Sequence, residues 1–215
     1  MSLILQDVCI TPKSGAPLFA PLSLTIGLGQ IGAVMGPSGA GKSTLLAAIA
    51  GHLPQGFSLS GEITLNGARM NDTAPQLRRI GIMFQDALLF PHLSLADNLA
   101  FGLPAQIKGA AARTAAVEQA LAAAGLAGMG ARDPATLSGG ERARAALMRS
   151  LLAQPQAILL DEPFSKLDTA LRADIRAFAF DHIRASAIPA LIVTHDDNDA
   201  AAAGGPFLNL GRQAG

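Results

Sequence analysis

The chain has 215 residues, of which half are hydrophobic and 15% are charged. This composition is opposite to that of disordered chains, and the length suffices for one large domain or two small ones with a buried core. Sixteen basic side chains balance sixteen acidic ones, so the chain has no net field that would attract nucleic acid. We therefore expect a folded protein without a nucleic-acid partner.

The low charge raises the question of a membrane-spanning helix, because no charged residue occurs from Ser14 to Gly41. Glycines and prolines interrupt that stretch, whereas a spanning helix needs about 20 mostly apolar residues in unbroken helical geometry. The N-terminal residues lack the basic segment of a secretory signal, and the single cysteine, Cys9, cannot form an internal disulfide. We expect a soluble protein of a reducing compartment, with Cys9 buried.

Strand-like segments flank a glycine-rich loop in the first half of the chain. The first two, Leu3–Ile10 and Leu22–Ile26, predict an antiparallel layer, and Asn66-Gly67 predicts a hairpin turn. A short buried strand, the glycine-rich loop and a helix ended by Gly51 follow one another directly. The expected strands are Leu3–Ile10, Leu22–Ile26, Gly32–Met35, Gly61–Leu65 and Arg79–Phe84, and the expected helix is Thr44–Ala50.

The second half begins with an alanine-rich, helical segment and then alternates strand and helix. Continuous apolar runs on both sides of a helix are typical of parallel strands that are buried on both faces. We expect an α/β fold with a mainly parallel sheet, an antiparallel β layer and an inserted helical subdomain over 85–153, with 1–84 and 154–215 as the core. The expected elements are helices Ala110–Ala124 and Thr169–Ser186 and strands Ala157–Leu160, Ala190–Thr194 and Phe207–Leu210.

The glycine-rich loop matches the phosphate-loop pattern, in which Gly and four further residues precede Gly-Lys-Ser. Its backbone N–H groups would surround a phosphate, and the helix that follows adds its positive dipole. Lys42 would bind the β- and γ-phosphates, and the Ser43 hydroxyl would bind Mg²⁺. We estimate a chance match in about 1 of 200 such chains. The expected ATP-binding residues are Gly36, Pro37, Ser38, Gly39, Ala40, Gly41, Lys42, Ser43 and Thr44.

Two adjacent carboxylates, Asp161 and Glu162, end the apolar run that starts at Ala157. Because ligands bind at the carboxyl ends of parallel strands, Asp161 is expected beside the phosphate loop, where it can hold Mg²⁺. Glu162 would then polarise the attacking water. With the phosphate loop, this pair predicts a P-loop nucleoside triphosphate hydrolase fold.

A second predicted anion site lies where another helix begins. Its first-turn N–H groups and bare glycines are suited to a phosphate, while Ser138 and Glu141 also fit a simple capping box. The capping box alone leaves the double glycine unexplained. The segment consists of Leu137, Ser138, Gly139, Gly140 and Glu141.

The order of these motifs resembles the ATP-binding cassette family, the ATPase subunits of ABC transporters, over essentially the whole chain. GPSGAGKS resembles Walker A, ILLDEP resembles Walker B and LSGGE resembles the family signature. Three further motifs resemble those of the family: Gln85 of the Q-loop, Ser165-Lys166-Leu167-Asp168 of the D-loop and the switch histidine His195.

The resemblance implies a head-to-tail homodimer in which each ATP lies between Walker A of one cassette and the signature of the other. It further implies that Gln85 contacts Mg²⁺ or the attacking water and that Asp168 contacts the opposite cassette. His195 would bind the γ-phosphate. The catalytic residues implied are Glu162, His195, Gln85 and Lys42; the metal ligands are Ser43, Gln85 and Asp161.

The chain departs from the family pattern where the adenine is normally stacked. The usual aromatic position falls near Thr11 and Pro12, the chain has no Tyr or Trp, and Phe19 is a nearby candidate. Core packing explains Phe19 equally well. In addition, Glu141 replaces the commoner Gln of the signature, and Lys166 replaces a small D-loop residue.

Residues Phe84–Ser94 and Asn98–Leu103 resemble bacterial importer cassettes. This implies an integral membrane permease, a periplasmic substrate-binding protein and a cytoplasmic location on the inner face of the membrane. The short length, without the C-terminal regulatory domain of many importer ATPases, resembles thiamine importers most.

Three alternatives from other classes stay open. A soluble cassette ATPase of DNA repair or the ribosome would normally show a coiled-coil insertion or two cassettes. A P-loop kinase or GTPase would lack LSGGE and the switch histidine. A nucleotide sensor without hydrolysis would not need Glu162.

Overall fold

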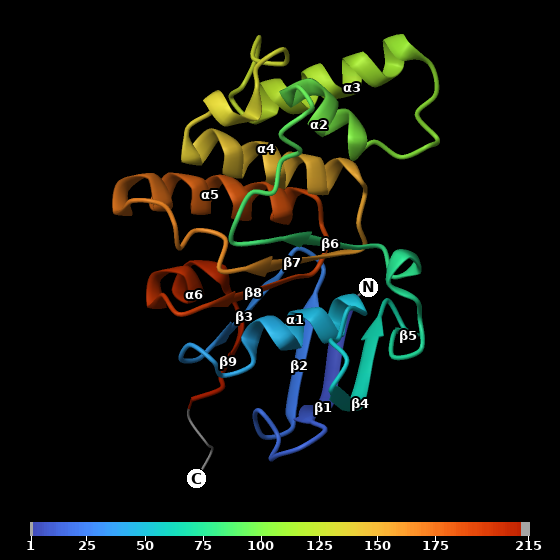
Figure 1. The fold of residues 1–215 in the computed structure, drawn as a ribbon, viewed down its shortest axis with the longest axis vertical. Helices are drawn as coiled ribbons and strands as arrows, with labels where there is room; N and C mark the ends of the chain where they lie inside the picture. Colours follow the sequence, from blue (N-terminus) through green and yellow to red (C-terminus); the bar gives the residue numbers. More distant parts are fainter. Residues whose placement is uncertain (1, 212–215) are drawn as a thin grey trace. The chain divides into compact units, whose positions relative to one another are not determined.

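The computed structural model describes residues 2–211, which divide into two compact units (Figure 1). The sheet unit comprises residues 1–82, 156–162 and 183–215, and the helical unit comprises 83–155 and 163–182. The segment 163–182, which we expected in the core, belongs to the helical unit. The reason is packing: a Cβ on Gly140 would lie 2.8 Å from Leu171 Cδ1, and Phe178 packs on the apolar core of the helices.

The sheet unit begins with an antiparallel sheet in the order β2-β1-β4-β5, which confirms the expected antiparallel layer. The alternation of buried and exposed residues in β2 is the pattern of a strand with one face on the core. A bulge between Leu5 and Val8 shifts the register of β1 against β2. Asn66 and Gly67 both have positive φ, as a two-residue hairpin turn between β4 and β5 requires. The strands are β1 (Ser2–Pro12), β2 (Leu22–Gly27), β4 (Phe57–Leu65) and β5 (Ala68–Arg69).

A second sheet has the order β6-β7-β8-β3-β9, in which β7, β8, β3 and β9 run parallel. Every residue of β3 and β8 is buried, as expected for a parallel sheet that is covered on both faces. The parallel sheet predicted from the apolar runs is confirmed. The strands are β3 (Ile31–Met35), β6 (Ile80–Met83), β7 (Ala157–Asp161), β8 (Ala190–Thr194) and β9 (Gly204–Asn209).

Helix α1 (Lys42–Ala50) places its apolar side chains in one core with strands of both sheets. Leu45 and Ile49 are fully buried there beside Leu3 and Ile63 of the antiparallel sheet. Because α1 follows directly on the phosphate loop, this core fixes the position of the loop. Two short elements of the sheet unit were not predicted: the 3-10 turn Pro75–Leu77 and helix α6 (Asp197–Ala203), which is too short to show helical periodicity.

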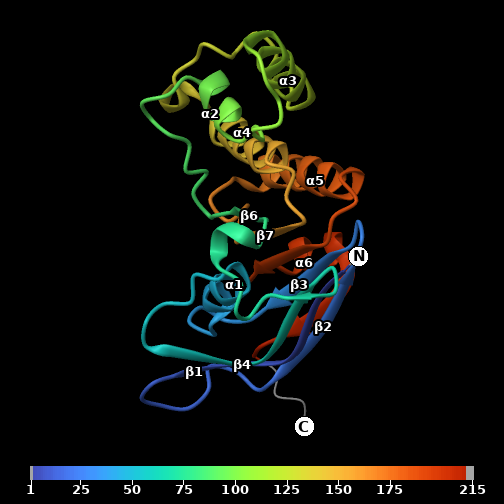
Figure 2. The same cartoon turned by 90° about the vertical axis from the view of Figure 1, so that its right-hand side faces the viewer.

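The helical unit contains α2, α3 and α4 around a core of its own, together with the greater part of α5 (Figure 2). The predicted helix over 110–124 is confirmed, and its Val117 and Leu121 are buried. Helix α2 was not predicted, because seven residues give too few turns for a clear pattern. Its bounds and those of the others are α2 (Leu95–Phe101), α3 (Ala110–Ala123), α4 (Gly139–Leu152) and α5 (Thr169–Ala185).

Arg78 is a buried cation that caps the carboxyl end of α1. Only 5% of the residue is exposed, and its guanidinium donates hydrogen bonds to the carbonyl oxygens of Ala48 (3.0 Å), Ile49 (2.8 Å) and Thr73 (2.8 Å). Burial lowers the pKa of Arg78, yet these carbonyls supply the partners that a buried charge needs. Helix ends leave such carbonyls without intrahelical partners.

We expect Arg78→Met to lower the free energy of unfolding by about 2–3 kcal/mol, because the buried Ile49 carbonyl loses its guanidinium donor, whereas the Ala48 carbonyl retains the N–H of Gly51. Urea denaturation followed by circular dichroism measures this. Arg69→Met is the matched control, since the Arg69 side chain is 58% exposed and pairs with the exposed Asp72. The control should change stability by less than about 0.5 kcal/mol. Equal effects of the two substitutions would contradict the capping role.

Candidate nucleotide-binding site

The phosphate loop joins β3 to α1 in the sheet unit. Gly41, the residue before α1, has φ 87°, a conformation that side chains with a Cβ rarely adopt. A Cβ there would also lie 3.0 Å from Leu18 Cδ1 and 3.2 Å from Phe19 Cε1, so the loop packs directly on these two side chains. Ser38 and Gly39 are exposed at the tip of the loop. One side of the loop therefore packs on Leu18 and Phe19, and its tip is accessible to solvent.

Lys42 is a buried cation at the start of α1, with 5% of the residue exposed. Its ammonium group donates hydrogen bonds to the carbonyl oxygens of Gly36 (2.8 Å) and Pro37 (3.0 Å). It also lies 3.4 Å from Glu162 Oε1. The charge is thus held inside the loop, where it faces the carboxylate at the end of β7.

Ser43 and Asp161 meet as the sequence predicts, although they are far apart in the chain. The Ser43 hydroxyl donates a hydrogen bond to Asp161 Oδ1 at 2.9 Å. Burial raises the pKa of Asp161, with a further contribution from the negative charge of Glu162, so the carboxylate lacks a full complement of positive partners. Hydroxyl and carboxylate oxygens are the ligands that Mg²⁺ prefers.

The oxygen pair of Ser43 and Asp161 fits a Mg²⁺ ion that phosphate oxygens also bind. Within residues 2–211, no group of three or more His, Cys, Asp or Glu side chains could hold a metal ion. A cation in this place would need ligands from a phosphate or from water, which is the usual arrangement for Mg²⁺ at nucleotides.

Glu162 follows Asp161 in a left-handed backbone conformation with φ 44°, which is uncommon for a residue with a Cβ. Its N–H donates to the carbonyl oxygen of Val193 at 2.9 Å, and its Oε2 lies 3.0 Å from His195 Nδ1. The same carboxylate therefore faces both Lys42 and His195. Such strain is typical of positions where function fixes a side chain.

The Q-loop and D-loop segments contact each other within the helical unit. Gln85 Nε2 donates to Ser165 Oγ at 3.0 Å, and the Lys166 ammonium pairs with the Asp86 carboxylate. Lys166, which replaces the small D-loop residue, therefore links the D-loop segment to the Q-loop segment through its ion pair with Asp86. Gln85, Gly139 and Lys166 line a hollow of about 120 Å³ in this unit.

The signature segment begins α4 with a capping box. Ser138 Oγ accepts from the N–H of Glu141 at 3.2 Å, and Glu141 Oε2 accepts from the N–H of Ser138 at 2.7 Å. The latter bond lowers the pKa of Glu141. Gly140 is buried against Leu171, so packing accounts for the second glycine, whereas Gly139 and Ser138 stay accessible. The local geometry therefore explains Gly140 without a ligand.

Asp168 lies at the start of α5, where its Oδ1 accepts a hydrogen bond from the N–H of Leu171 at 2.9 Å. This is the geometry of a helix cap. The side chain is exposed in the single chain. Its predicted contact with an opposite cassette stays a prediction.

Asn98 is a residue of this region that sequence reasoning missed. It is fully buried in α2, its Nδ2 donates to the carbonyls of Phe90 (3.1 Å) and Ser94 (3.0 Å), and its Oδ1 accepts from the N–H of Phe90 at 2.7 Å. Arg149 donates to the carbonyl of Leu88 at 3.1 Å and lies over the Phe90 ring. These contacts hold the segment that follows Gln85.

A pocket of about 320 Å³ opens above the phosphate loop. The candidate Phe19 is not among its lining residues: it is 7% exposed and belongs to the core, with its backbone carbonyl accepting from Cys9 Sγ at 3.4 Å. Core packing is therefore the correct interpretation of Phe19, and Cys9 is buried as expected. The pocket is lined by Leu18, Ser38, Gly39, Gly41, Lys42, Ser43, Thr44, Phe57 and Glu162.

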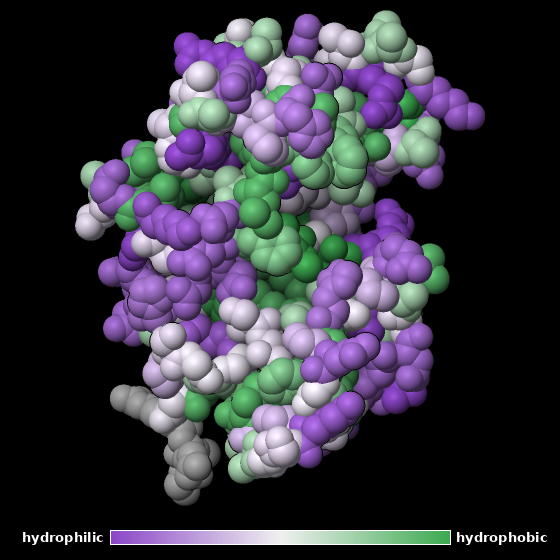
Figure 3. Space-filling view, viewed as in Figure 1, coloured by the Kyte–Doolittle hydropathy of each residue, from purple (hydrophilic) through white to green (hydrophobic). Residues whose placement is uncertain are grey.

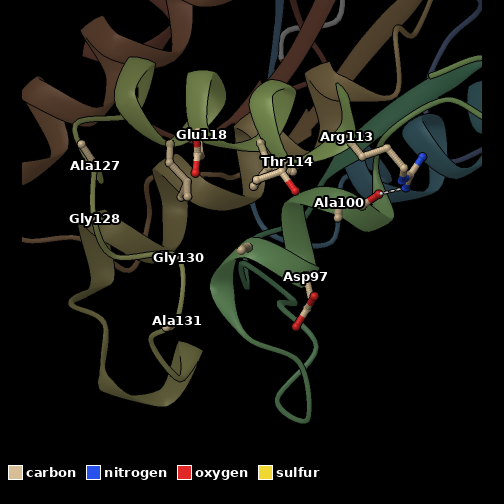
Figure 4. A pocket seen from close by; sticks show the side chains of 12 residues that line it. Asp97, Ala100, Arg113, Thr114, Glu118, Ala127, Gly128, Gly130 and Ala131 are labelled. Atoms are coloured by element: carbon tan, nitrogen blue, oxygen red, sulfur yellow. Dashed lines mark hydrogen bonds between the residues drawn. The ribbon is translucent and has the colours of Figure 1, made fainter. Parts of the chain in front are cut away.

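A larger pocket of about 520 Å³ lies between α2, α3 and the loop after α3 (Figure 4). Small residues such as Ala96, Ala100 and Gly130 form much of its wall, which follows from the alanine-rich composition of this segment. The guanidinium of Arg113 donates a hydrogen bond to the carbonyl oxygen of Ala100 at 2.9 Å. None of the motif residues named above lines this pocket.

Comparison with known proteins gives the same picture. Residues 19–165 match the family described as ABC transporter. The chain is 52% identical over 185 residues to the uncharacterized ABC transporter ATP-binding protein YnjD of Escherichia coli, covering 86% of this chain and 85% of the relative. It is 44% identical over 168 residues to the thiamine import ATP-binding protein ThiQ of Cereibacter sphaeroides, covering 78% and 71%. Other relatives are named for import of sulfate or thiosulfate and of aliphatic sulfonates.

A solved structure supports the same assignment at the level of the fold. The ATP-binding cassette MJ0796, in a dimeric post-hydrolysis state bound to ADP and Pi, superposes with a TM-score of 0.79 and 28% identity. The alignment covers 97% of this chain and 94% of the other. The expected α/β fold with its antiparallel layer and helical region is thereby confirmed. The chain belongs to the ABC transporter family and is its ATP-hydrolysing cassette.

Proposed function

We propose that this cassette binds Mg²⁺ and ATP at the phosphate loop, hydrolyses ATP at Glu162 and thereby drives a bacterial importer. The observation that carries the proposal is that Glu162 contacts both Lys42 (3.4 Å) and His195 (3.0 Å). Lys42 begins α1, and the other two residues directly follow β7 and β8. These side chains come from three separate segments of the sequence. Parallel sheets place ligands at this edge.

In the sheet unit, basic and acidic side chains would have different roles in ATP hydrolysis. Lys42 and the N–H groups of the loop neutralise the phosphates, while Ser43 and Asp161 hold Mg²⁺, which supplies further charge neutralisation when bound. Glu162 is the group that orients and polarises the attacking water. His195, which contacts the Glu162 carboxylate in the chain without nucleotide, is assigned to the γ-phosphate.

The signature segment and the two loops would complete the site across a homodimer. Ser138 and Gly139 expose the N-terminus of a 14-residue helix, and such an end attracts phosphate. The solved cassette that this chain resembles is dimeric. We therefore assign Leu137–Glu141 to the ATP of the partner cassette, with Asp168 at the same interface. Gln85 is assigned to Mg²⁺ or the attacking water.

The surface of the helical unit supports docking on a membrane permease. Phe84, Leu88 and Phe101 are 46%, 56% and 69% exposed, although large apolar side chains are usually buried. Apolar side chains gather on the segment between β6 and α2 in Figure 3. Exposed apolar surface of this kind is typical of protein–protein interfaces.

The proposed location is the cytoplasmic face of the cell membrane, with a periplasmic binding protein as the third component of the importer. In the part of the chain that the structure describes, no helix has both the length and the apolar character needed to cross a bilayer. Thiamine is one candidate substrate, because a thiamine import ATPase is among the relatives.

Glu162→Gln should lower the rate of ATP hydrolysis at least about a hundredfold, because the amide cannot act as a general base. Nucleotide affinity should stay within about threefold, since Lys42 keeps its hydrogen bonds to the loop carbonyls and Ser43 keeps its bond to Asp161. Phosphate release and equilibrium binding measure the two quantities. Glu62→Gln, at an exposed position of β4, is the control and should leave both unchanged. Undiminished hydrolysis in Glu162→Gln would refute the mechanism.

A mixing experiment tests the shared site. Lys42→Ala removes the phosphate contact and Ser138→Arg blocks the signature, so each variant alone should lack hydrolysis. An equal mixture should recover about a quarter of the wild-type rate, because half of the dimers are mixed and each has one intact site of two. Absence of recovery at every mixing ratio would contradict a head-to-tail dimer.

Phe101→Glu tests the permease surface. The charge should reduce copurification with the membrane subunits at least about tenfold, because an apolar contact would become a buried charge. ATP binding by the purified cassette should be unaffected. Leu77→Glu is the matched control, because Leu77 is also 69% exposed but lies in the sheet unit. Equal losses in both variants would argue against this docking surface.

A further inference from the structure

The nucleotide pocket lacks the aromatic residue that the family resemblance implies at the end of β1. Thr11 and Pro12 occupy that place, the chain contains no Tyr or Trp, and Phe19 is buried in the core. Of the nine residues that line the pocket above the phosphate loop, one is aromatic, namely Phe57. A ring is therefore present in this pocket, but it comes from a different strand.

The pairing of β1 with β4 places Phe57 beside Pro12, the position at which the aromatic residue is missing. Pro12 and Phe57 are opposite each other in the register of the two antiparallel strands. Residues directly opposite in such a pair point to the same face and have Cβ atoms about 4.5–5.5 Å apart. The bond from the Lys13 N–H to the Gly56 carbonyl, 2.7 Å long, continues this pairing beyond the strand ends. Phe57 therefore lies next to position 12 on the same face of the sheet.

The surroundings of Phe57 fix one part of its side chain and leave another part open. It is half-buried and packs against the apolar core of the sheet unit, while it also lines the pocket. Leu18 is likewise half-buried, lines the same pocket and lies against Gly41 of the phosphate loop. Leu18 and Phe57 thus form an apolar wall beside the phosphate loop, within the same pocket.

We propose that Phe57 supplies the stacking face for the purine base of the bound nucleoside triphosphate, with Leu18 as the adjoining apolar wall. This inference rests on the proposed function, because it takes the phosphate loop as the site of the triphosphate. Stacking on an aromatic side chain strengthens binding by about five- to 150-fold per base. A phenyl ring can provide such a face without any hydrogen bond to the base.

The absence of Trp and Tyr makes a direct optical test possible. Phe57→Trp places a single tryptophan in the chain, and we expect ATP to quench its fluorescence while inorganic triphosphate, which has no base, does not. Phe207→Trp is the matched control, because Phe207 is 50% exposed on β9 and does not line this pocket. No change in Phe57→Trp at saturating ATP, or an equal change with triphosphate, would overturn the proposal.

Affinity measurements provide the second test. Phe57→Ala should weaken binding of ATP at least about fivefold and leave binding of inorganic triphosphate within twofold, whereas Phe57→Tyr should retain the wild-type affinity for ATP. Equal weakening of both ligands would assign Phe57 a purely structural role and would overturn the proposal. If Phe57→Ala fails to fold, the comparison of Phe57→Tyr with Phe57→Leu decides the matter: equal ATP affinity of these two would refute stacking.

The two levels of the argument can fail separately. If the wild-type chain binds neither ATP nor inorganic triphosphate, the proposed function itself is wrong. If it binds both with the same affinity, the phosphate site stands and the stacking role of Phe57 is refuted.

Discussion

A buried positive charge organises the site of this protein. Lys42 has almost no contact with solvent, and an isolated ammonium group in an apolar interior would be strongly destabilising. The carbonyls of Gly36 and Pro37 and the carboxylate of Glu162 meet that requirement, so the phosphate loop, α1 and the end of β7 are coupled through one group. Phosphates can replace the partners of Lys42 at no further desolvation of the charge, which is why a loop of this kind is ready for an anion.

The two carboxylate residues next to this charge, Asp161 and Glu162, each lower the stability of the folded chain when no ligand is bound. Burial raises the pKa of Asp161, which means that its ionised form is less favourable in the folded chain than in water. Glu162 lies in a left-handed conformation, tied by its N–H to Val193 and by its side chain to His195. A cation beside Asp161 would relieve the first cost. Stability is therefore lowered at the positions where the chemistry requires it.

The helical unit uses hydrogen bonds from side chains to backbone groups to hold its loops. Asn98 satisfies the backbone of the segment after Gln85 from inside α2, and Arg149 joins the same network. The capping box of Ser138 and Glu141 fixes the first turn of α4, while Gly140 lets α5 approach. These hydrogen bonds hold the backbone of the segment that carries the exposed side chain of Leu88.

The sequence by itself determined the phosphate loop, the carboxylate pair, the capping box and the apolar runs that form buried strands, because each is a pattern of a few neighbouring residues. Short elements such as α2 and α6 escaped prediction, since their periodicity is too brief. Only the tertiary structure decided that Arg78 caps α1, that residues 163–182 join the helical unit and that Phe57 rather than Phe19 faces the nucleotide pocket. Those outcomes depend on strand register and side-chain packing between distant segments, which no local pattern in the chain encodes.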